Sequence, residues 1–346
     1  ARYRARASTY RKCGNAVTTA LRVALLAGGP SSEAAVSRVS AASVRAALLE
    51  VGHTVTSFEL EPSLARTLDP AAFDVAFPVL HGPLGEDGCT QGLLEVIGVP
   101  YVGSAVLASA LAAHKPAAKA LFRQAGLPVA EDAVVHAGDP ALSARELRAR
   151  LGRAVVVKPA GGGSAIGVAR IQSEEDDAVL DRALESAFAI DATALVERFV
   201  TGLEVTCGVL EDDAGLAHAL PPTLISARAA EWYDFKSRYG TGGSAHQCPA
   251  PFAAALIANI QTLAVAAHRA LGARDLSRVD FVVREDGPEP VTLLEVNTLP
   301  GMTATSLFPE AAAVAGIPFV TLCDRLVRRA HARPRRAAPP VQPMPD

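Results

Sequence analysis

Aromatic and sulfur-containing side chains are scarce in this sequence. Phe, Trp and Tyr make up 5% of the 346 residues, and the chain has two methionines and one tryptophan. Since half of the residues are hydrophobic, the core must be built mainly from Ala, Val and Leu. The cysteines form no CxxC pair and no His/Cys group at metal-ligand spacing, which argues against a disulfide scaffold or a zinc site. We therefore expect reduced thiols and a cytoplasmic protein. The cysteines are Cys13, Cys89, Cys207, Cys248 and Cys323.

Long apolar runs and an excess of basic charge are also missing. No run reaches the roughly 18 apolar residues that a membrane span requires, because charged residues, Gly or Pro interrupt each candidate. The formal net charge of −3 argues against a nucleic-acid-binding protein. We expect neither a membrane nor a nucleic acid as a partner.

The length predicts two or three domains, at roughly 150 residues per domain. Residues 1–20 are basic and carry neither an apolar segment nor a periodic pattern, so we expect a disordered extension there. Residues 332–346 are rich in Pro and Arg and are expected to form a tail. Between these ends we expect domains at 21–116, 117–206 and 207–331.

The pattern of the first of these domains is typical of an open α/β sheet. Apolar runs at 21–29, 53–60 and 73–80 predict strands, and the amphipathic run at 31–52 predicts a helix with a Ser N-cap. A helical pattern then covers 104–126, but Pro116 requires a break or a first-turn position just after Lys115. The following two domains alternate strands and helices in an α+β plan. Their expected strands are 154–160, 166–171, 192–200, 203–210, 215–225, 277–283 and 291–297, and 231–247 is expected to be a loop.

The stretch KPAGGGSAIG, residues 158–167, is dense in glycine. Its spacing approaches that of a P-loop, but Val168 stands where that motif needs Lys. The dinucleotide fingerprint fails as well, because its spacing is wrong and no helix follows. What remains is a strand ending in Lys158, a glycine hairpin carrying Ser164 and a returning strand. Two readings stay open: a phosphate held beneath a mobile flap, or an ordinary hairpin with a solvated lysine.

Two strands with acidic residues flank the turn REDGPEP, whose Asp-Gly pair favours a hairpin. A turn centred between Gly287 and Pro288 places Asp280 opposite Glu295, because these positions are symmetric about that centre. Facing carboxylates destabilise a strand pair unless a cation lies between them. Asn297 shares the face of Glu295 and completes a set of oxygen ligands that suits Mg²⁺. We favour this metal site over two solvated acids on an exposed edge.

The loop TLPGMTATS follows this hairpin and offers backbone N–H groups for an oxyanion. Arg278 lies two residues before Asp280, on the same face of its strand. A cation, metal ligands and an oxyanion site together indicate ATP-dependent acyl transfer.

In their order and spacing these motifs resemble the ATP-grasp superfamily and, within it, the D-alanine–D-alanine ligases. The match runs from about Val23 to Arg329. Its motifs are GGPSSEAAVS, LHGPLGEDG, GVPYVGS, KPAGGGSAIGV, WYDFKSRY and LLEVNTLPGMTATSLFPEAA. The resemblance implies the ATP-grasp fold, in which an N-terminal open parallel sheet is followed by two α+β subdomains that clasp ATP.

The resemblance also implies the positions that bind ATP and metal. Lys115 and Lys158 would hold the phosphates. Glu197 and the backbone near Val200 would contact the adenine, and Glu204 would contact the ribose. The ATP-binding positions are Lys115, Lys158, Ser164, Glu197, Val200, Glu204 and Arg238. The ligands of two Mg²⁺ ions, or of Mn²⁺ in their place, would be Asp280, Glu295 and Asn297.

A second set of positions is implied for the two amino-acid substrates. Glu33 would bind the ammonium group of the first D-alanine, with His81 beside it. Ser306 and Leu307 would receive the carboxylate of the second D-alanine. Arg278 and the N–H of Gly301 would hold the tetrahedral intermediate, and Ser164 and Tyr239 would link the closing loops to Glu33.

The chain departs from the family pattern at a few positions. Arg238 stands where relatives usually carry a Lys for the γ-phosphate, which keeps the charge but changes its geometry. Gly161, Gly162 and Ala165 replace bulkier or hydroxylated flap residues, which predicts a more mobile flap. Tyr239 is the residue typical of relatives that make a dipeptide.

The implied function is synthesis of D-alanyl-D-alanine for peptidoglycan from ATP and two D-alanines, through an acyl phosphate, by a homodimer. Two alternatives stay open. One is a related ligase with D-serine, D-lactate or another acceptor, and the other is a nucleotide-binding regulator on the same fold. The retained lysines and metal ligands argue against the regulator.

Overall fold

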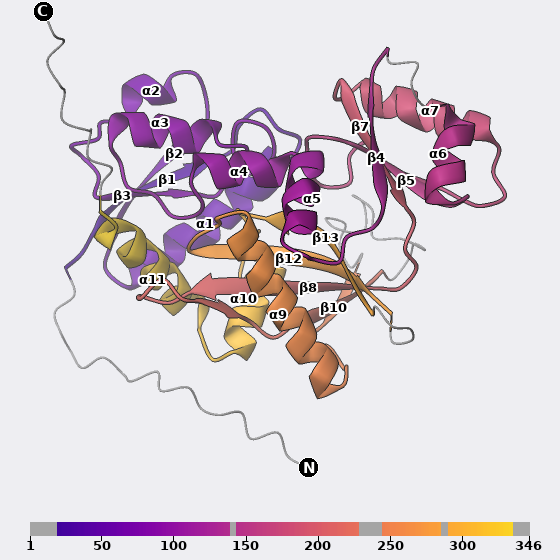
Figure 1. Cartoon of the computed structure of the whole chain (residues 1–346). Coiled ribbons are helices and arrows are strands. Elements are labelled where there is room, and N and C mark those ends of the chain that lie inside the picture. The colour runs from indigo at the N-terminus through magenta and orange to yellow at the C-terminus, as the bar shows by residue number, and fades with distance from the viewer. Residues whose placement is uncertain (1–18, 139–142, 228–243, 285–289, 335–346) are drawn as a thin grey trace, which may run out of the picture.

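The computed structural model describes residues 19–138, 143–227, 244–284 and 290–334. Within these residues the chain forms three β-sheets (Figure 1). In this view the N-terminal sheet lies at the upper left, the second sheet at the upper right and the third below both.

The N-terminal sheet has the strand order β2-β1-β3, and both strand pairs are parallel. The predicted open parallel sheet is thus confirmed. The expected Ser N-cap is wrong: Glu33 is the N-cap residue of α1, and Ser31 Oγ accepts its N–H at 3.3 Å. The Glu33 side chain makes no capping bond to α1. The elements are β1 (Arg22–Ala27), α1 (Ala34–Glu50), β2 (Thr54–Glu59), α2 (Leu64–Thr67), β3 (Val75–Pro78) and α3 (Cys89–Ile97).

The helical run after this sheet breaks at His114, as Pro116 predicts. Helix α4 (Val106–Ala113) ends before it and α5 (Lys115–Gln124) begins after it. His114 caps α5, because its Nδ1 accepts the N–H of Ala117 at 3.2 Å. The break places Lys115 at the first position of a new helix.

The second sheet is antiparallel with the order β4-β7-β5-β6, and α6 and α7 pack against it. Strands β5 and β6 pair on either side of the glycine stretch, with Val157 opposite Ala169. The predicted strand, glycine turn and returning strand are therefore confirmed. The elements are β4 (Asp132–His136), α6 (Ala144–Leu151), β5 (Val155–Pro159), β6 (Ala169–Ile171), α7 (Asp177–Phe188) and β7 (Thr193–Arg198).

The third sheet has the order β11-β10-β8-β12-β13, with β9 also paired to β8. Two expectations for it are wrong. Residues 215–225 form two strands, because Pro221 and Pro222 interrupt the run and proline has no N–H for a strand ladder. Residues 244–247, expected in a loop, pair with β10 at the sheet edge. The elements are β8 (Leu203–Glu211), β9 (Ala217–Ala219), β10 (Thr223–Ala227), β11 (Ser244–Gln247), α9 (Ala254–Ala270), β12 (Leu276–Val283), β13 (Val291–Asn297), α10 (Leu307–Val314) and α11 (Phe319–Ala332).

The N-terminal sheet is fixed to the third sheet through the C-terminal helices. One hydrophobic cluster contains residues of β1, α1, α10 and α11. Buried Asp275, just before β12, accepts the N–H of Gly103 at 2.7 Å and the Nε–H of Arg329 at 3.0 Å. This joint ties the segment between α3 and α4, together with α11, to the start of β12.

Among the described helices, none alone is long and apolar enough to cross a membrane. Only α10 and α11 taken together reach the required length and composition, and they are bent by 103° relative to each other.

We propose that the three sheets mark the three domains. The expected boundary between residues 206 and 207 falls within β8. A boundary just before Leu203 keeps this strand intact.

Candidate functional site

A cavity of about 370 Å³ brings together strands of the third sheet, the glycine stretch between β5 and β6, the loop after β3 and the starts of α1 and α5. Most of the predicted site residues line it. They are Glu33, His81, Lys115, Ser164, Glu204, Arg278, Asp280, Glu295, Asn297, Gly301, Ser306 and Leu307. Lys158, Glu197 and Val200 are not among its lining residues, and Arg238 and Tyr239 lie outside the described residues.

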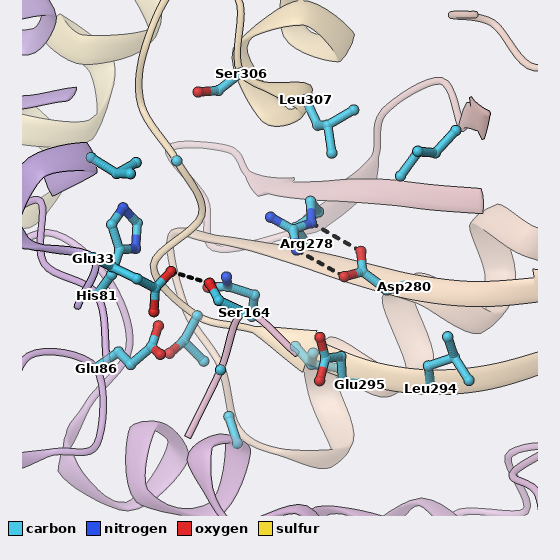
Figure 2. A pocket seen from close by; sticks show the side chains of 18 of the residues that line it. Glu33, His81, Glu86, Ser164, Arg278, Asp280, Leu294, Glu295, Ser306 and Leu307 are labelled. Carbon is cyan, nitrogen blue, oxygen red and sulfur yellow. Dashed lines mark hydrogen bonds and ion pairs between the residues drawn. The ribbon is translucent and has the colours of Figure 1, made fainter. Parts of the chain in front are cut away.

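The glycine stretch reaches across this cavity to the N-terminal domain. Ser164 Oγ donates a hydrogen bond to Glu33 Oε1 (Figure 2). Ser164 and Ala165 have φ angles of 53° and 56°, and Gly162 and Gly167 have φ angles of 85° and 70°. These left-handed backbone conformations turn the stretch tightly; Gly162 and Gly167 adopt them without strain, whereas for Ser164 and Ala165 they are unfavourable. The stretch therefore turns tightly beside the cavity, and Ser164 is in contact with Glu33; we refer to residues 161–167 as the flap.

Two further polar side chains lie beside Glu33 at this end of the cavity. His81 is 7% exposed, and its Nε2 has no hydrogen-bond partner among the described residues. Burial lowers the pKa of His81, and Arg278 lowers it further, against the opposing effect of Glu33. A neutral imidazole with an unpartnered nitrogen is poised to receive a polar ligand.

The second of these side chains, Glu86, is absent from the predicted set. Its Oε1 accepts the N–H of Gly82 at 3.0 Å. Burial and the nearby carboxylates of Glu33 and Glu295 raise the pKa of Glu86 to about 7, although the Gly82 N–H and Lys115 act in the opposite direction. Glu86 lies in the motif LHGPLGEDG, so the sequence marked this loop as a candidate. The motif did not indicate which of its residues faces the cavity.

Strands β12 and β13 carry the predicted acidic pair in the predicted register. Asp280 lies opposite Glu295, and Arg278 lies opposite Asn297. The pairing symmetric about the predicted turn centre covers the residues from Arg278 to Asp280. After Asp280 a bulge shifts the register by one residue and leaves Leu294 without an opposite residue on β12. The deduced opposition of the two acids is confirmed, although the hairpin is not regular.

Arg278 and Asp280 form a two-pronged ion pair on β12, shown by the dashed lines in Figure 2. The Nε and Nη2 groups of Arg278 donate to Asp280 at 2.9 and 2.8 Å. Thr206 Oγ1 on the adjacent strand donates to the same carboxylate at 2.6 Å. These bonds fix both the guanidinium and the acid at the wall of the cavity.

The chemistry of the predicted metal ligands fits a hard divalent cation. The described residues contain no cluster of three or more His, Cys, Asp or Glu side chains that could hold a metal. The predicted set has two carboxylates and one amide, and all three line the cavity on adjacent strands. Facing acids carry a surplus of negative charge, and Mg²⁺ is usually held by one or two carboxylates together with substrate phosphates. Asp280, Glu295 and Asn297 could therefore hold Mg²⁺ beside a nucleotide.

The second sheet holds a separate cluster of buried charges behind the flap. Glu197 on β7 lies between two cations, since Lys119 pairs with its Oε1 and Lys158 with its Oε2. Burial acts to raise the pKa of Glu197, but the two lysines prevail and lower it to about 2. Lys119 also lies 3.4 Å from Asp132. Lys158 thus sits at the strand exit as predicted, but its partner here is a carboxylate.

Lys119 is a second residue that the sequence analysis missed. It is 2% exposed and lies four residues after Lys115 on α5, so the two lysines share one side of the helix. This spacing was the available signal. Lys115 itself donates to the flap carbonyl of Gly162 at 2.5 Å, and burial lowers its pKa.

The end of the cavity near α10 carries hydroxyl groups. Ser306 is the N-cap residue of α10, and its Oγ accepts the N–H of Thr303 at 3.1 Å. A β-carbon at Gly301 would lie 3.1 Å from Ser306 Oγ, so the backbone there approaches the hydroxyl closely. Backbone N–H groups at a helix N-terminus favour an anion. A carboxylate would suit this end.

Comparison with known proteins gives consistent matches over most of the chain. A family model described as the D-ala D-ala ligase C-terminus matches residues 121–328, and one described as the D-ala D-ala ligase N-terminus matches residues 61–104. The D-alanine–D-alanine ligase of Desulforudis audaxviator is 44% identical over 313 residues, covering 90% of this chain and 99% of that protein. The corresponding ligase of Nitratidesulfovibrio vulgaris is 42% identical over 308 residues, covering 89% and 97%. The crystal structure of the D-alanine–D-alanine ligase from Bacillus anthracis complexed with ATP is 29% identical, with a TM-score of 0.77 and coverage of 90% and 97%.

Proposed function

Because this chain belongs to the family of D-alanine–D-alanine ligases, we propose that it joins two D-alanines into D-alanyl-D-alanine and converts ATP to ADP and phosphate. The observation that carries the proposal is the single cavity that gathers Glu33, Arg278 and Ser306 from separate parts of the fold. The fold is that of the ATP-grasp ligases. The dipeptide would serve peptidoglycan synthesis.

The reaction would proceed in two steps. The carboxylate of the first D-alanine attacks the γ-phosphorus of ATP, which yields an acyl phosphate and ADP. The neutral amine of the second D-alanine then attacks the carbonyl carbon, and phosphate leaves from the tetrahedral intermediate. Neither step requires a covalent bond to the protein, so the chain contributes position, charge and exclusion of water.

Cationic groups of the chain would bind the charged parts of ATP and the intermediate. Lys115 and Lys158 would bind phosphate oxygens, for which Lys158 must exchange its present partner, Glu197. Arg278 and the N–H of Gly301 would stabilise the oxygen of the intermediate. Mg²⁺ held by Asp280, Glu295 and Asn297 would neutralise phosphate charge when bound.

Other groups would orient the two amino acids. Glu33 would hold the ammonium group of the first D-alanine, and Ser306 with the N–H of Leu307 would hold the carboxylate of the second. The flap would close over the cavity through Ser164 and keep water from the acyl phosphate. Glu204, which lines the cavity, would contact the ribose, and Glu197 and Val200 would lie near the adenine.

The proposal is tested by incubating the protein with ATP, Mg²⁺ and D-alanine. Formation of ADP together with a product of the mass of D-alanyl-D-alanine is the expected result. ADP release that requires D-serine or D-lactate would instead indicate a related ligase, and no turnover with any acceptor would overturn the proposal. The resemblance alone leads us to propose a homodimer in the cytoplasm, and light scattering in solution tests its assembly state.

A further inference from the structure

The first-substrate end of the cavity contains more polar groups than the roles above use. Figure 2 shows the carboxyl groups of Glu33 and Glu86 turned toward each other, with His81 above them. Both acids and the histidine line the cavity. The buried Nε2 of His81 has no hydrogen-bond partner within the described part of the chain. The two facing acids favour a positively charged group between them, and the unpartnered buried nitrogen of His81 favours a polar or negatively charged group. Together they point to a ligand that carries a group of each kind.

We infer that Glu86 is a second substrate-binding carboxylate and that the ammonium group of the first amino acid binds between Glu86 and Glu33. The inference rests on the proposed function and adds to it a residue that was not predicted. In this arrangement His81 faces the polar remainder of the same substrate.

The charges of the ligand-free site support this arrangement. Two carboxylates that face each other in a buried site repel, and the repulsion is relieved when a cation lies between them. Burial is the main cause of the raised pKa of Glu86, and the nearby carboxylates of Glu33 and Glu295 raise it further. Lys115 is the cationic group that acts on Glu86 in the opposite direction, and its Nζ donates to the flap carbonyl of Gly162.

Hydrogen-bond capacity gives a second reason. A primary ammonium group has three N–H donors, and one oxygen of Glu33 already accepts the flap hydroxyl of Ser164. A single carboxylate in that state leaves donors of a buried ammonium unsatisfied, which is unfavourable. Glu86 supplies further acceptor positions beside its bond to the Gly82 N–H.

The flap backbone covers both acids at this point. A β-carbon at Gly163 would lie 3.4 Å from Glu86 Oε1 and 3.7 Å from Glu33 Oε2. The flap thus lies directly over the space between the two carboxylates, and Gly163 leaves that space free of a side chain. A ligand held there would be enclosed when the flap is closed.

The test is Glu86→Gln, which removes the charge and keeps an oxygen that can accept the Gly82 N–H. Initial rates of dipeptide formation over a range of D-alanine concentrations, fitted to two successive binding sites, give separate KM values for the first and second D-alanine. We expect the first KM to rise about tenfold to a hundredfold, as for loss of a hydrogen bond to a charged group. The KM for the second D-alanine and for ATP should stay within about twofold. Glu50→Gln, an exposed acid of the same domain, is the matched control and should leave all three unchanged.

An unchanged first KM in Glu86→Gln would overturn the inference, and so would an equal rise of all three KM values, since that would indicate a structural role. If this variant does not fold, Gly163→Ala replaces it, because the added methyl group would crowd the proposed ammonium position and raise the first KM selectively. No rise in that variant would likewise contradict the inference. Failure of the proposed function is distinguishable, because then the unmodified protein would form no dipeptide.

Discussion

Two groups of buried charges flank the flap, and they are balanced in different ways. In the second sheet, Glu197 is held between Lys119 and Lys158, so its charge is neutralised within the chain. At the first-substrate end, Glu33 and Glu86 face each other and share the site with a neutral histidine. Breaking an internally balanced buried cluster from one side is costly, whereas carboxylates that oppose each other's ionisation favour a cation between them. The first group is therefore balanced before ATP binds, although Lys158 is proposed to exchange Glu197 for a phosphate, and the second group favours a cationic ligand.

Removing the central cation of the balanced cluster should have the largest effect on stability. Lys119→Met leaves Glu197 with one cation and Asp132 without its buried ammonium neighbour. Breaking a buried ion pair from one side costs about 3–5 kcal/mol, so we expect a loss of that size in the free energy of unfolding. Urea denaturation measures it. The double variant with Glu197→Gln and Lys119→Met should recover part of this loss. If the free energy of unfolding of Lys119→Met alone lies within about 1 kcal/mol of that of the unmodified chain, the proposed difference between the two charge groups is wrong.

Arg278→Ala should have the next largest effect, this time on catalysis. The change removes a group proposed to hold the intermediate and leaves Asp280 without its two-pronged partner. Loss of one such stabilising donor typically lowers the rate by about 10²–10³-fold, and we expect that loss in kcat/KM. Arg22→Ala, which breaks an exposed ion pair with Asp74, is the control and should change kcat/KM by less than about twofold. A loss below about tenfold in Arg278→Ala would argue against its role.

Ser164→Ala tests how the flap depends on the surplus of acid beneath it. The variant removes the hydroxyl that donates to Glu33 and leaves the flap backbone intact. Since a hydrogen bond to a charged group contributes roughly 1.5–3 kcal/mol, kcat/KM should fall about tenfold or more. Ser186→Ala removes an exposed hydroxyl of α7 and should have no effect. Equal activities of the two variants would show that the flap does not close through this bond.

The two groups also differ in how far the sequence predicted them. The opposition of Asp280 and Glu295 was deduced by counting from the turn, and it is met together with a bulge, because the pairs nearer the turn are shifted by one residue. Glu33 and Ser164, which are 131 residues apart, were connected only through the family resemblance. The charged neighbours of Glu86 and of Lys119 come from other elements and have no local pattern, although Glu86 also accepts the N–H of nearby Gly82.

The errors in the prediction of the fold have similar physical causes. Strand β11 pairs at a sheet edge with β10, which ends well before it in the sequence at Ala227, so neither its composition nor its spacing identified it. The bulge after Asp280 inserts one residue into β13, and a count symmetric about the turn cannot detect it. Local periodicity located most strands, whereas tertiary pairing determined where each strand begins and ends and where its register shifts.

The last expected effect concerns the stability of the ligand-free protein at different pH. The pKa of Glu86 is raised to about 7 in the folded chain, above the ordinary value of 4.5. Ionised Glu86 therefore disfavours the folded state, and the unmodified protein should lose stability as the pH rises from about 4.5 through about 7. Glu86→Gln cannot ionise, so its melting temperature relative to the unmodified chain should increase between about pH 5 and pH 8. Saturating D-alanine should reduce this difference at about pH 8, because an ammonium group between the two acids neutralises the surplus that the variant removes. A difference that is constant over this pH range would show that the first-substrate end is balanced within the chain, as the Glu197 cluster is.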